Sequence, residues 1–360
     1  MRLIADSERF PAARFKPEAT LVRFPDVRQR DDGAFELYDE EKKRWNKLNP
    51  IYMRALEGLR DGLTFESCIE RALPDRGDLL PNQVAAALRA FWWGLHKRGH
   101  LHVPLEAEPD VFAGRYRRVK ELGRGGVGIA ALCIDEKTGD RVVIKHAWGY
   151  LGDPERNDAS LREEAALLRR FDHPGILAVR DEFERDGLHH MVRDFGDGCE
   201  LKDAVIPSGA PFRAFVHDVA DALAHIHERG YLCLDLKPGN IVVTPELKPI
   251  LIDLGCARPV VDGVLSLPRP IGSRGFVAPE TMEQFVATVR SDVYGLGCLL
   301  HAYRARSTPA HRCTNAQRAA ALEELKIEEE EKRIILALTA DDPMTRPADM
   351  RAVQSLMRHA

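Results

Sequence analysis

The stretch YLCLDLKPGNIVV, residues 231–243, places three polar side chains of different chemistry in a short loop between two apolar runs. Asp235 offers a carboxylate, Lys237 a cation and Asn240 an amide oxygen. Taken one at a time, such residues beside a proline and a glycine are typical of an ordinary turn. The chemistry of the loop therefore depends on the residues elsewhere in the chain that complete it.

A fourth polar residue, Asp253, follows the next apolar run in the segment ILIDLGCA. Transfer of a phosphoryl group requires a carboxylate that orients the attacking hydroxyl, oxygen ligands for Mg²⁺ and a cation near the moving charge. Asp235 suits the first role and Lys237 the third, while Asn240 and Asp253 offer the hard oxygen atoms that Mg²⁺ prefers. The spacing therefore predicts a loop suited to phosphoryl transfer with Mg²⁺.

A glycine-rich turn, GRGGVG at residues 123–128, lies between two predicted strands upstream of this loop. Gly123, Gly125 and Gly128 have no Cβ, so the backbone there could approach a phosphate closely and turn its N–H groups toward it. Taken alone, the glycines are explained equally well by an ordinary hairpin turn. We interpret them as a nucleotide-binding turn because they precede the loop of Asp235.

Lys145 ends the apolar run VVIK, a predicted strand that should lie beside the glycine-rich turn. A lysine on a strand is usually exposed to solvent, and a carboxylate partner would change this interpretation. The predicted helix in DASLREEAALLRRF supplies Glu164, after an expected capping box of Ser160 and Glu163. A pair of Lys145 and Glu164 would hold the ammonium group against the α and β phosphates of ATP.

These residues belong to a series of short motifs whose order resembles that of eukaryotic-type (Hanks-type) protein kinases. The resemblance covers about Tyr116 to Leu356 and implies a two-lobed α+β fold, in which a small β-rich lobe precedes a helical lobe. It also implies that Glu280 pairs with Arg346, and that Asp292 begins a central helix and braces the catalytic loop. The motifs, in order, are GRGGVG, VVIK, the helix of Glu164, LDLKPGN, DLG, GSRGFVAPE, SDVYGLG and DDPMTRP.

The position of Lys237, two residues after Asp235, resembles the serine/threonine branch of this family. The resemblance therefore implies that the acceptor is an aliphatic hydroxyl group of a protein or peptide. Ser273 stands where that branch often has a threonine, and it would lie near Asp235 and the acceptor. Without that role, Ser273 is an ordinary loop serine or a phosphorylation site.

Two residues of the loop depart from the family pattern, since Cys233 and Leu234 stand where histidine and arginine are usual. The arginine commonly binds a phosphate on the activation loop, and Leu234 cannot form such a charge-assisted contact. Between residues 256 and 277, only Ser266 and Ser273 carry a hydroxyl group. We therefore predict an active kinase whose activity does not depend on phosphorylation of this loop.

A third departure is Arg193, which falls near the hinge position that usually carries an apolar gatekeeper residue. It indicates an unusual nucleotide pocket. The alternative to an active enzyme is a pseudokinase scaffold that binds nucleotide and presents a peptide.

The region before the kinase motifs has a resemblance of its own, to the PqqD-type RiPP recognition element. It rests on the segment LVRFPDVRQRDDGAFELYDEEKKRWNKLNPIYMRALEGLRDGLTFESCIERAL, together with a predicted helix over residues 84–98. The resemblance implies a small winged-helix α+β domain that holds a leader peptide as an added strand, lined by residues 43–48 and the 84–98 helix. Binding of DNA and regulatory docking on the kinase are the alternatives, although acidic and basic residues nearly balance here, which disfavours DNA.

The predicted domains are an N-terminal extension over residues 1–17, the recognition element over 18–104, a linker over 105–115 and the kinase domain over 116–357. Apolar residues make up 44% of the 360 residues, enough for a core in each domain, and the net charge of -4 gives no general attraction to nucleic acid. The chain has no signal-peptide pattern, no apolar run of about 18 residues and no CxxC pair among its seven cysteines. We expect a cytoplasmic protein with neither nucleic acid nor membrane as a partner.

Overall fold

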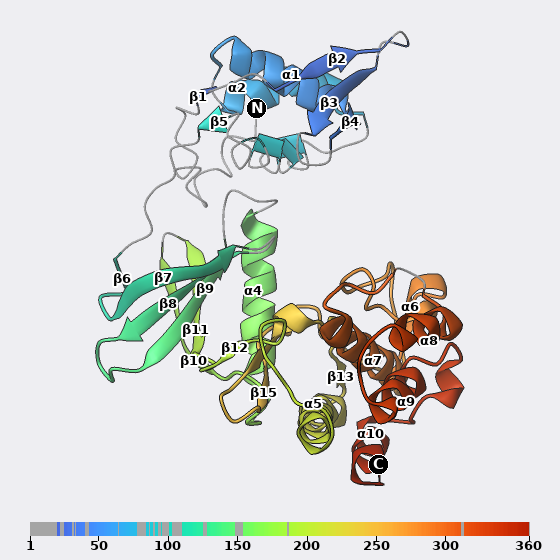
Figure 1. Ribbon diagram of the computed structural model, residues 1–360. Helices are drawn as coiled ribbons and strands as arrows, with labels where there is room; N and C mark the ends of the chain where they lie inside the picture. Colours follow the sequence, from blue (N-terminus) through green and yellow to red (C-terminus); the bar gives the residue numbers. More distant parts are fainter. Residues whose placement is uncertain are drawn as a thin grey trace. The chain divides into compact units, whose positions relative to one another are not determined.

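The computed structural model contains two compact units (Figure 1). The first comprises residues 1–162 and 181–192, and the second comprises residues 163–180 and 193–360. Gly125 and the predicted extension over residues 1–17 lie outside the described residues. The described residues are 20–21, 25–30, 32, 34–39, 43–63, 65–77, 84–85, 87–88, 91–92, 95, 101–102, 110–124, 128–147, 154–185, 187–310 and 313–359.

The N-terminal region contains a three-stranded antiparallel sheet, followed by helices α1 and α2. Their bounds are β2 Val27–Gln29, β3 Phe35–Asp39, β4 Arg44–Leu48, α1 Pro50–Arg60 and α2 Phe65–Ala72; a separate strand pair joins β1 Thr20–Leu21 to β5 Leu101–His102. Strand β3 lies between β2 and β4. Helix α1 begins after Asn49, whose side-chain oxygen accepts the backbone N–H of Ile51 (3.0 Å), as expected of an N-cap asparagine.

The helical periodicity predicted for residues 84–98 is present in the described part of that segment. Residues 84, 85, 87, 88, 91, 92 and 95 are helical. Val84, Leu88, Trp92 and Leu95 are fully buried, in one cluster with side chains of α1 and β3. The described residues therefore agree with the helix predicted over residues 84–98, and the winged-helix assignment itself stays a prediction.

A six-stranded sheet forms the β-rich part of the predicted kinase fold. Its strands are β6 Val111–Phe112, β7 Tyr116–Arg124, β8 Gly128–Asp135, β9 Arg141–Ala147, β10 Val179–Arg185 and β11 Leu188–Asp194, in the order β10-β11-β9-β8-β7-β6. Phe112 of β6 is fully buried in a cluster with Tyr116, Ile144 and Val192. The sheet thus begins inside the segment predicted as a linker, because Phe112 contributes to its core.

Helix α4, Pro154–Leu168, begins earlier than predicted. Ser160 and Glu163 lie within the helix, so the predicted capping box is wrong. A proline in the first turn is favourable because its missing N–H needs no partner there. Asp158, inside the helix, accepts hydrogen bonds from Arg162 Nε (2.8 Å) and from the backbone N–H of His189 (2.6 Å).

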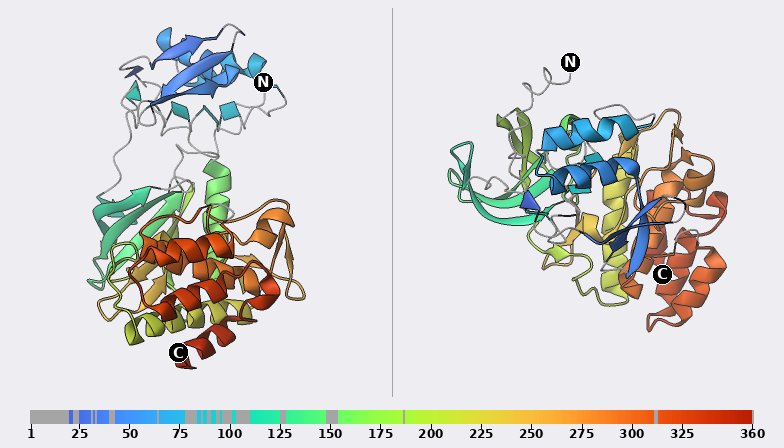
Figure 2. Two further views of the ribbon diagram at one scale, coloured as in Figure 1. Left: turned by 45° about the vertical axis from the view of Figure 1, so that its right-hand side comes forward. Right: turned by 90° about the horizontal axis from the view of Figure 1, so that it is seen from above.

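The second unit is mainly helical and is organised around α7 (Figure 2). Residues 291–303 of α7 are all buried, which confirms the central helix that the resemblance implied. The helices are α5 Ala210–Glu228, α6 Pro279–Glu283, α7 Val289–Ala305, α8 Asn315–Glu323, α9 Glu329–Leu338 and α10 Met350–His359. Helix α9 packs against α7 and α8, and α10 packs against α5 and α7.

Short strands connect these helices in three small sheets. One has the order β12 (Cys199–Glu200), β14 (Ile241–Val243), β15 (Pro249–Leu251); another pairs β13 (Tyr231–Leu232) with β16 (Arg258–Pro259); the last pairs β17 (Leu265–Ser266) with β18 (Val286–Ala287). In the described part of the chain, no helix is both long and apolar enough to cross a membrane.

The implied pair of Glu280 and Arg346 is present in the second unit. Arg346 donates from Nη1 to Glu280 Oε1 (2.9 Å) and from Nη2 to Oε2 (3.0 Å), with its side chain fully buried. Ser291 at the start of α7 donates to the same carboxylate (2.8 Å). This bidentate pair joins α6, α7 and the segment before α10, and its hydrogen bonds offset the cost of burying two charges.

Candidate active site

The loop between β13 and β14 brings three of the predicted site residues together in the second unit. Ser273 donates its backbone N–H to Asp235 Oδ1 (2.6 Å), and Lys237 Nζ donates to Asp235 Oδ2 (2.6 Å). Asn240 Nδ2 donates to the backbone oxygen of Asp235 (2.9 Å) and at longer range to Oδ2 (3.3 Å). Donors on both oxygens therefore hold the Asp235 carboxylate in one orientation.

Ser273 lies next to Asp235, as predicted from its position in the sequence. Lys237 Nζ donates to Ser273 Oγ (2.8 Å) as well as to Asp235, so one ammonium group joins the carboxylate and the hydroxyl. The Lys237 side chain is one-third exposed, and that of Asp235 is mostly buried. The cation is thus placed between the catalytic loop and the segment that precedes Glu280.

Asn240 and Asp253 are linked through the backbone. The N–H of Ile252 donates to the carbonyl oxygen of Asn240 (3.0 Å), and Asp253 follows directly. The Asn240 amide nitrogen faces Asp235, which leaves the amide oxygen as the atom that could bind a metal. One carboxylate and one amide oxygen on adjoining backbone suit a hard cation such as Mg²⁺, which usually completes its shell with water and phosphate.

Glu164 lies beside the segment Asp253, Leu254 and Gly255. A Cβ placed on Gly255 would lie 3.2 Å from Asp253 Oδ1 and 3.5 Å from Glu164 Oε2, and the Gly255 N–H donates to Asp253 Oδ1 (2.9 Å). Glu164 is buried on α4. Lys145 lies half-buried on β9 of the first unit, and its pairing with Glu164 stays a prediction.

The glycines of the predicted nucleotide-binding turn differ in whether a larger residue would fit in their place. Gly128 begins β8, where a Cβ would come within 2.1 Å of the carbonyl oxygen of His146 on β9, so only glycine fits. Gly123 lies on β7, and a Cβ there would meet no described atom within 4 Å. The close approach of β8 and β9 therefore explains Gly128 on structural grounds, and phosphate binding by Gly123, Gly125 and Gly128 stays a prediction.

Asp292 braces the catalytic loop, as the resemblance implied. Its Oδ2 accepts the backbone N–H of Cys233 (2.7 Å) and its Oδ1 accepts that of Leu234 (2.8 Å). His227 at the end of α5 also contacts Oδ2 through Nε2 (2.8 Å). His227 was not among the residues predicted from the sequence, where its only signal is a histidine shortly before the catalytic loop.

Leu234 adopts a backbone conformation that is unusual for its side chain. Its φ is 65°, in the left-handed region that costs an L-residue about 1–2 kcal/mol. The hydrogen bond from the Leu234 N–H to Asp292 holds Leu234 in this conformation. Gly272 approaches from the other side, since a Cβ on it would lie 2.4 Å from the Leu234 carbonyl oxygen, and its φ of 117° also favours glycine.

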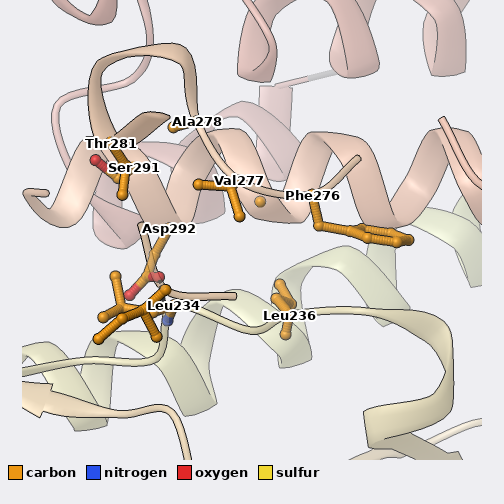
Figure 3. Close-up of a pocket in the computed structure, with 10 residues that line it drawn as sticks. Leu234, Leu236, Phe276, Val277, Ala278, Thr281, Ser291 and Asp292 are labelled. Carbon is orange, nitrogen blue, oxygen red and sulfur yellow. Dashed lines mark hydrogen bonds between the residues drawn. The ribbon is translucent and has the colours of Figure 1, made fainter. Parts of the chain in front are cut away.

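The Leu234 side chain packs against the segment between Asp253 and Glu280, which we call the activation segment. Figure 3 shows Leu234 and Leu236 on one side of a pocket whose other side includes Phe276 and Val277. The space left between them is about 10 Å³, room for about one water molecule. We name the apolar cluster around Leu234 the clasp; its members are Leu232, Leu234, Val260, Leu265, Leu267, Ile271, Ala287 and Val289.

Backbone pairing also fixes the activation segment. Strand β16 pairs with β13, directly before the catalytic loop, and β17 pairs with β18, directly before α7. The turn between β16 and β17 contains Asp262 and Gly263, both with positive φ, which suits a tight hairpin. The segment is therefore ordered by two strand pairs and by the clasp.

Two thiols lie near Asp235 and remain protonated. Burial raises the pKa of Cys233 well above its usual value, and the neighbouring charge of Asp292 raises it further. Burial also raises the pKa of Cys256, together with the charges of Asp235 and Asp253. Neither cysteine is therefore poised as a thiolate nucleophile.

Comparison with known proteins agrees with this geometry. The family model described as "Protein kinase domain" matches residues 116–359. Among solved structures, "PpkA-294 apo form" superposes with a TM-score of 0.57 at 22% identity, covering 70% of this chain and 99% of that one, which shows a shared fold.

Three curated relatives are named as serine/threonine-protein kinases. They are the probable kinase PknB of Lactococcus lactis (30% identical over 197 residues, 53% of this chain and 31% of the relative), Nek1 of Mus musculus (33% over 196 residues, 52% and 16%) and PknB of Mycolicibacterium smegmatis (31% over 204 residues, 54% and 33%). The chain spans a third or less of the length of these relatives.

Proposed function

This chain belongs to the protein kinase family, and we propose that it is a protein serine/threonine kinase that transfers the γ-phosphoryl group of ATP. The observation that carries the proposal is the arrangement of Asp235, Lys237 and Asn240 in one loop, with both Asp235 oxygens oriented by hydrogen bonds. Such a carboxylate can orient an acceptor hydroxyl and take its proton during transfer. The names of the relatives support the same activity.

The residues of the loop divide the chemistry among them. Asp235 accepts the proton of the attacking hydroxyl, and Lys237 places a positive charge where negative charge develops on the transferred group. Asn240 and Asp253 would hold Mg²⁺, which neutralises phosphate charge when it is bound. Lys237 contacts both Asp235 and Ser273. Lys237 and Ser273 are the two residues whose positions resemble the serine/threonine branch.

Replacing Asp235 by asparagine tests the enzyme proposal. Loss of the proton acceptor should lower kcat by about 10²–10⁴-fold, the usual contribution of a general base. Asp262→Asn is the matched control, because Asp262 is exposed in the hairpin turn and has a backbone conformation that asparagine tolerates. Activity is measured with labelled ATP on generic protein substrates, followed by analysis of the phosphorylated amino acids.

The pseudokinase alternative predicts a different pattern in the same experiment. In that case wild type and Asp235→Asn would both bind nucleotide, seen as a rise in melting temperature, and neither would transfer phosphate to itself or to any substrate. Phosphotyrosine as the main product would contradict the assignment to serine and threonine.

We also propose that activity does not require phosphorylation of the activation segment. In place of an arginine that would bind a phosphate, Leu234 packs in the clasp with apolar residues of that segment. Burial of apolar surface stabilises the activation segment as the chain folds, so this contact does not require a phosphate group. The two strand pairs add backbone hydrogen bonds at both ends of the hairpin.

Replacing Leu234 by asparagine tests the clasp, because asparagine tolerates the left-handed backbone and removes only the apolar contact. Leu234 is half-buried, so its apolar contact contributes about 1 kcal/mol. Its loss should lower the ordered fraction of the activation segment, and with it kcat of the unphosphorylated protein, about fivefold. Leu234→Met, which keeps the apolar volume, should stay within about twofold of wild type.

Phosphatase treatment of the wild type is the companion measurement. Mass spectrometry establishes that Ser266 and Ser273 carry no phosphate, and kcat is compared before and after treatment. Equal activity is expected. A large loss of activity on dephosphorylation, or an unaffected Leu234→Asn variant, would contradict the proposal.

We propose that the region 18–104 recruits the substrate, a peptide that pairs with β4. This strand ends the order β2-β3-β4, so one edge of it has no strand partner in the described part of the chain. An extended peptide can add to such an edge through main-chain hydrogen bonds. The substrate would then be a ribosomally made peptide with a leader segment. A cytoplasmic location fits this proposal.

Deleting residues 1–104 tests recruitment. Tethering raises the effective concentration of a bound substrate, so the deletion should lower kcat/KM for a peptide encoded beside the gene by about 10²-fold. Activity on a generic protein substrate should stay at the wild-type level. Equal loss on both substrates would instead indicate that this region regulates the kinase, and no loss on either would contradict recruitment.

A further inference from the structure

Arg193 is a buried cation that the proposed chemistry does not use. It lies near the end of β11, after Met191 and Val192, which are fully buried, and only 7% of its surface is exposed. An arginine in such surroundings is unusual, because its charge must be removed from water. Its contacts therefore indicate what it does.

The guanidinium group of Arg193 donates from Nη1 to the carbonyl oxygen of Ile252. The ladder between β14 and β15 ends with the pair Ile241 and Leu251, so Ile252 lies one residue beyond it. A carbonyl at that place has no strand partner and needs another donor when buried. Arg193 supplies that donor.

This carbonyl belongs to the peptide group that joins Ile252 to Asp253. On the other side of the same residue, the Ile252 N–H donates to the carbonyl oxygen of Asn240 (3.0 Å). The backbone of Ile252 is thus held on one side by Asn240, a proposed metal ligand, and on the other by Arg193. The orientation of the Ile252 carbonyl group determines the position of the next residue, Asp253. A rotation of this peptide group would displace the Asp253 carboxylate.

Simple filling of space does not account for Arg193. In the described part of the chain it forms no ion pair with a carboxylate, and its buried Nε has no hydrogen-bond partner. An apolar side chain of similar volume would fill the same space without the cost of removing a guanidinium charge from water. Its hydrogen bond to Ile252 is the contact that an apolar residue could not reproduce.

We propose that Arg193 is a positioning residue for Asp253, and that it sets the affinity of the site for Mg²⁺ by fixing the peptide group before this ligand. The inference rests on the proposed function, because it takes Asp253 and Asn240 as the Mg²⁺ ligands. It assigns a role in metal binding to a residue near the expected gatekeeper position.

Arg180 offers a matched control in the same unit. It pairs with Asp194, the residue next to Arg193, and its side chain is 42% exposed. Replacing Arg180 removes a positive charge close to Arg193 and leaves the hydrogen bond to Ile252 in place. Arg180→Met thus removes a nearby arginine charge and its ion pair with Asp194, whereas Arg193→Met removes the donor to the peptide group before Asp253.

The test measures binding of fluorescent ADP to the full-length chain, in EDTA and across a Mg²⁺ titration. Arg193→Met should raise the half-saturating Mg²⁺ concentration about tenfold, which corresponds to about 1.4 kcal/mol. Affinity for ADP in EDTA should stay at the wild-type level. Arg193→Lys, which keeps one cationic donor, should give an intermediate shift, and Arg180→Met should match wild type.

Two results would overturn the inference. One is an unchanged Mg²⁺ dependence in Arg193→Met. The other is an equal loss of ADP affinity with and without Mg²⁺, which would mean that Arg193 contacts the nucleotide directly. Circular dichroism establishes folding, and if Arg193→Met does not fold, the comparison of Arg193→Lys with wild type decides by the same criteria. Because binding is measured without phosphoryl transfer, a failure of the proposed enzyme activity is distinguishable from a failure of this inference.

Discussion

The carboxylate of Asp292 is the constraint on which the catalytic loop depends. It accepts the backbone N–H groups of Cys233 and Leu234 and the ring N–H of His227, in a place with almost no access to solvent. Two adjacent N–H groups that point to one carboxylate force a sharp bend, and Leu234 takes a left-handed conformation as a result. Strain of this kind persists only where the surroundings hold it, and here it orients Asp235, the next residue.

The same bend turns the side chain of Leu234 toward the activation segment. In the usual family pattern, an arginine at this place responds to a phosphate, so order in the segment is conditional. In our proposal, the clasp around Leu234 takes the place of that conditional charge pair with apolar contact, which is present whenever the chain is folded. The departure in the sequence thus bears on regulation, while the groups proposed for transfer, Asp235 and Lys237, are in contact.

Much of this arrangement could be predicted from the sequence, because the motifs carry residues with few alternative roles. The pairing of Glu280 with Arg346 and the bracing by Asp292 were implied by their motifs and are confirmed. Other features depend on contacts that local sequence does not show. Phe112 belongs to the sheet because its ring completes a core built from distant strands, and α4 begins at Pro154, where the sequence shows no apolar periodicity.

Hydrogen exchange of the full-length, unphosphorylated chain tests the account most directly. The account predicts that the amides of Cys233, Leu234, Val260 and Leu267 exchange slowly, as amides do in the buried helix α7, because their hydrogen-bond acceptors are fixed in the folded chain. Exchange at the rate of an open loop, with protection gained only after phosphorylation of the activation segment, would contradict it.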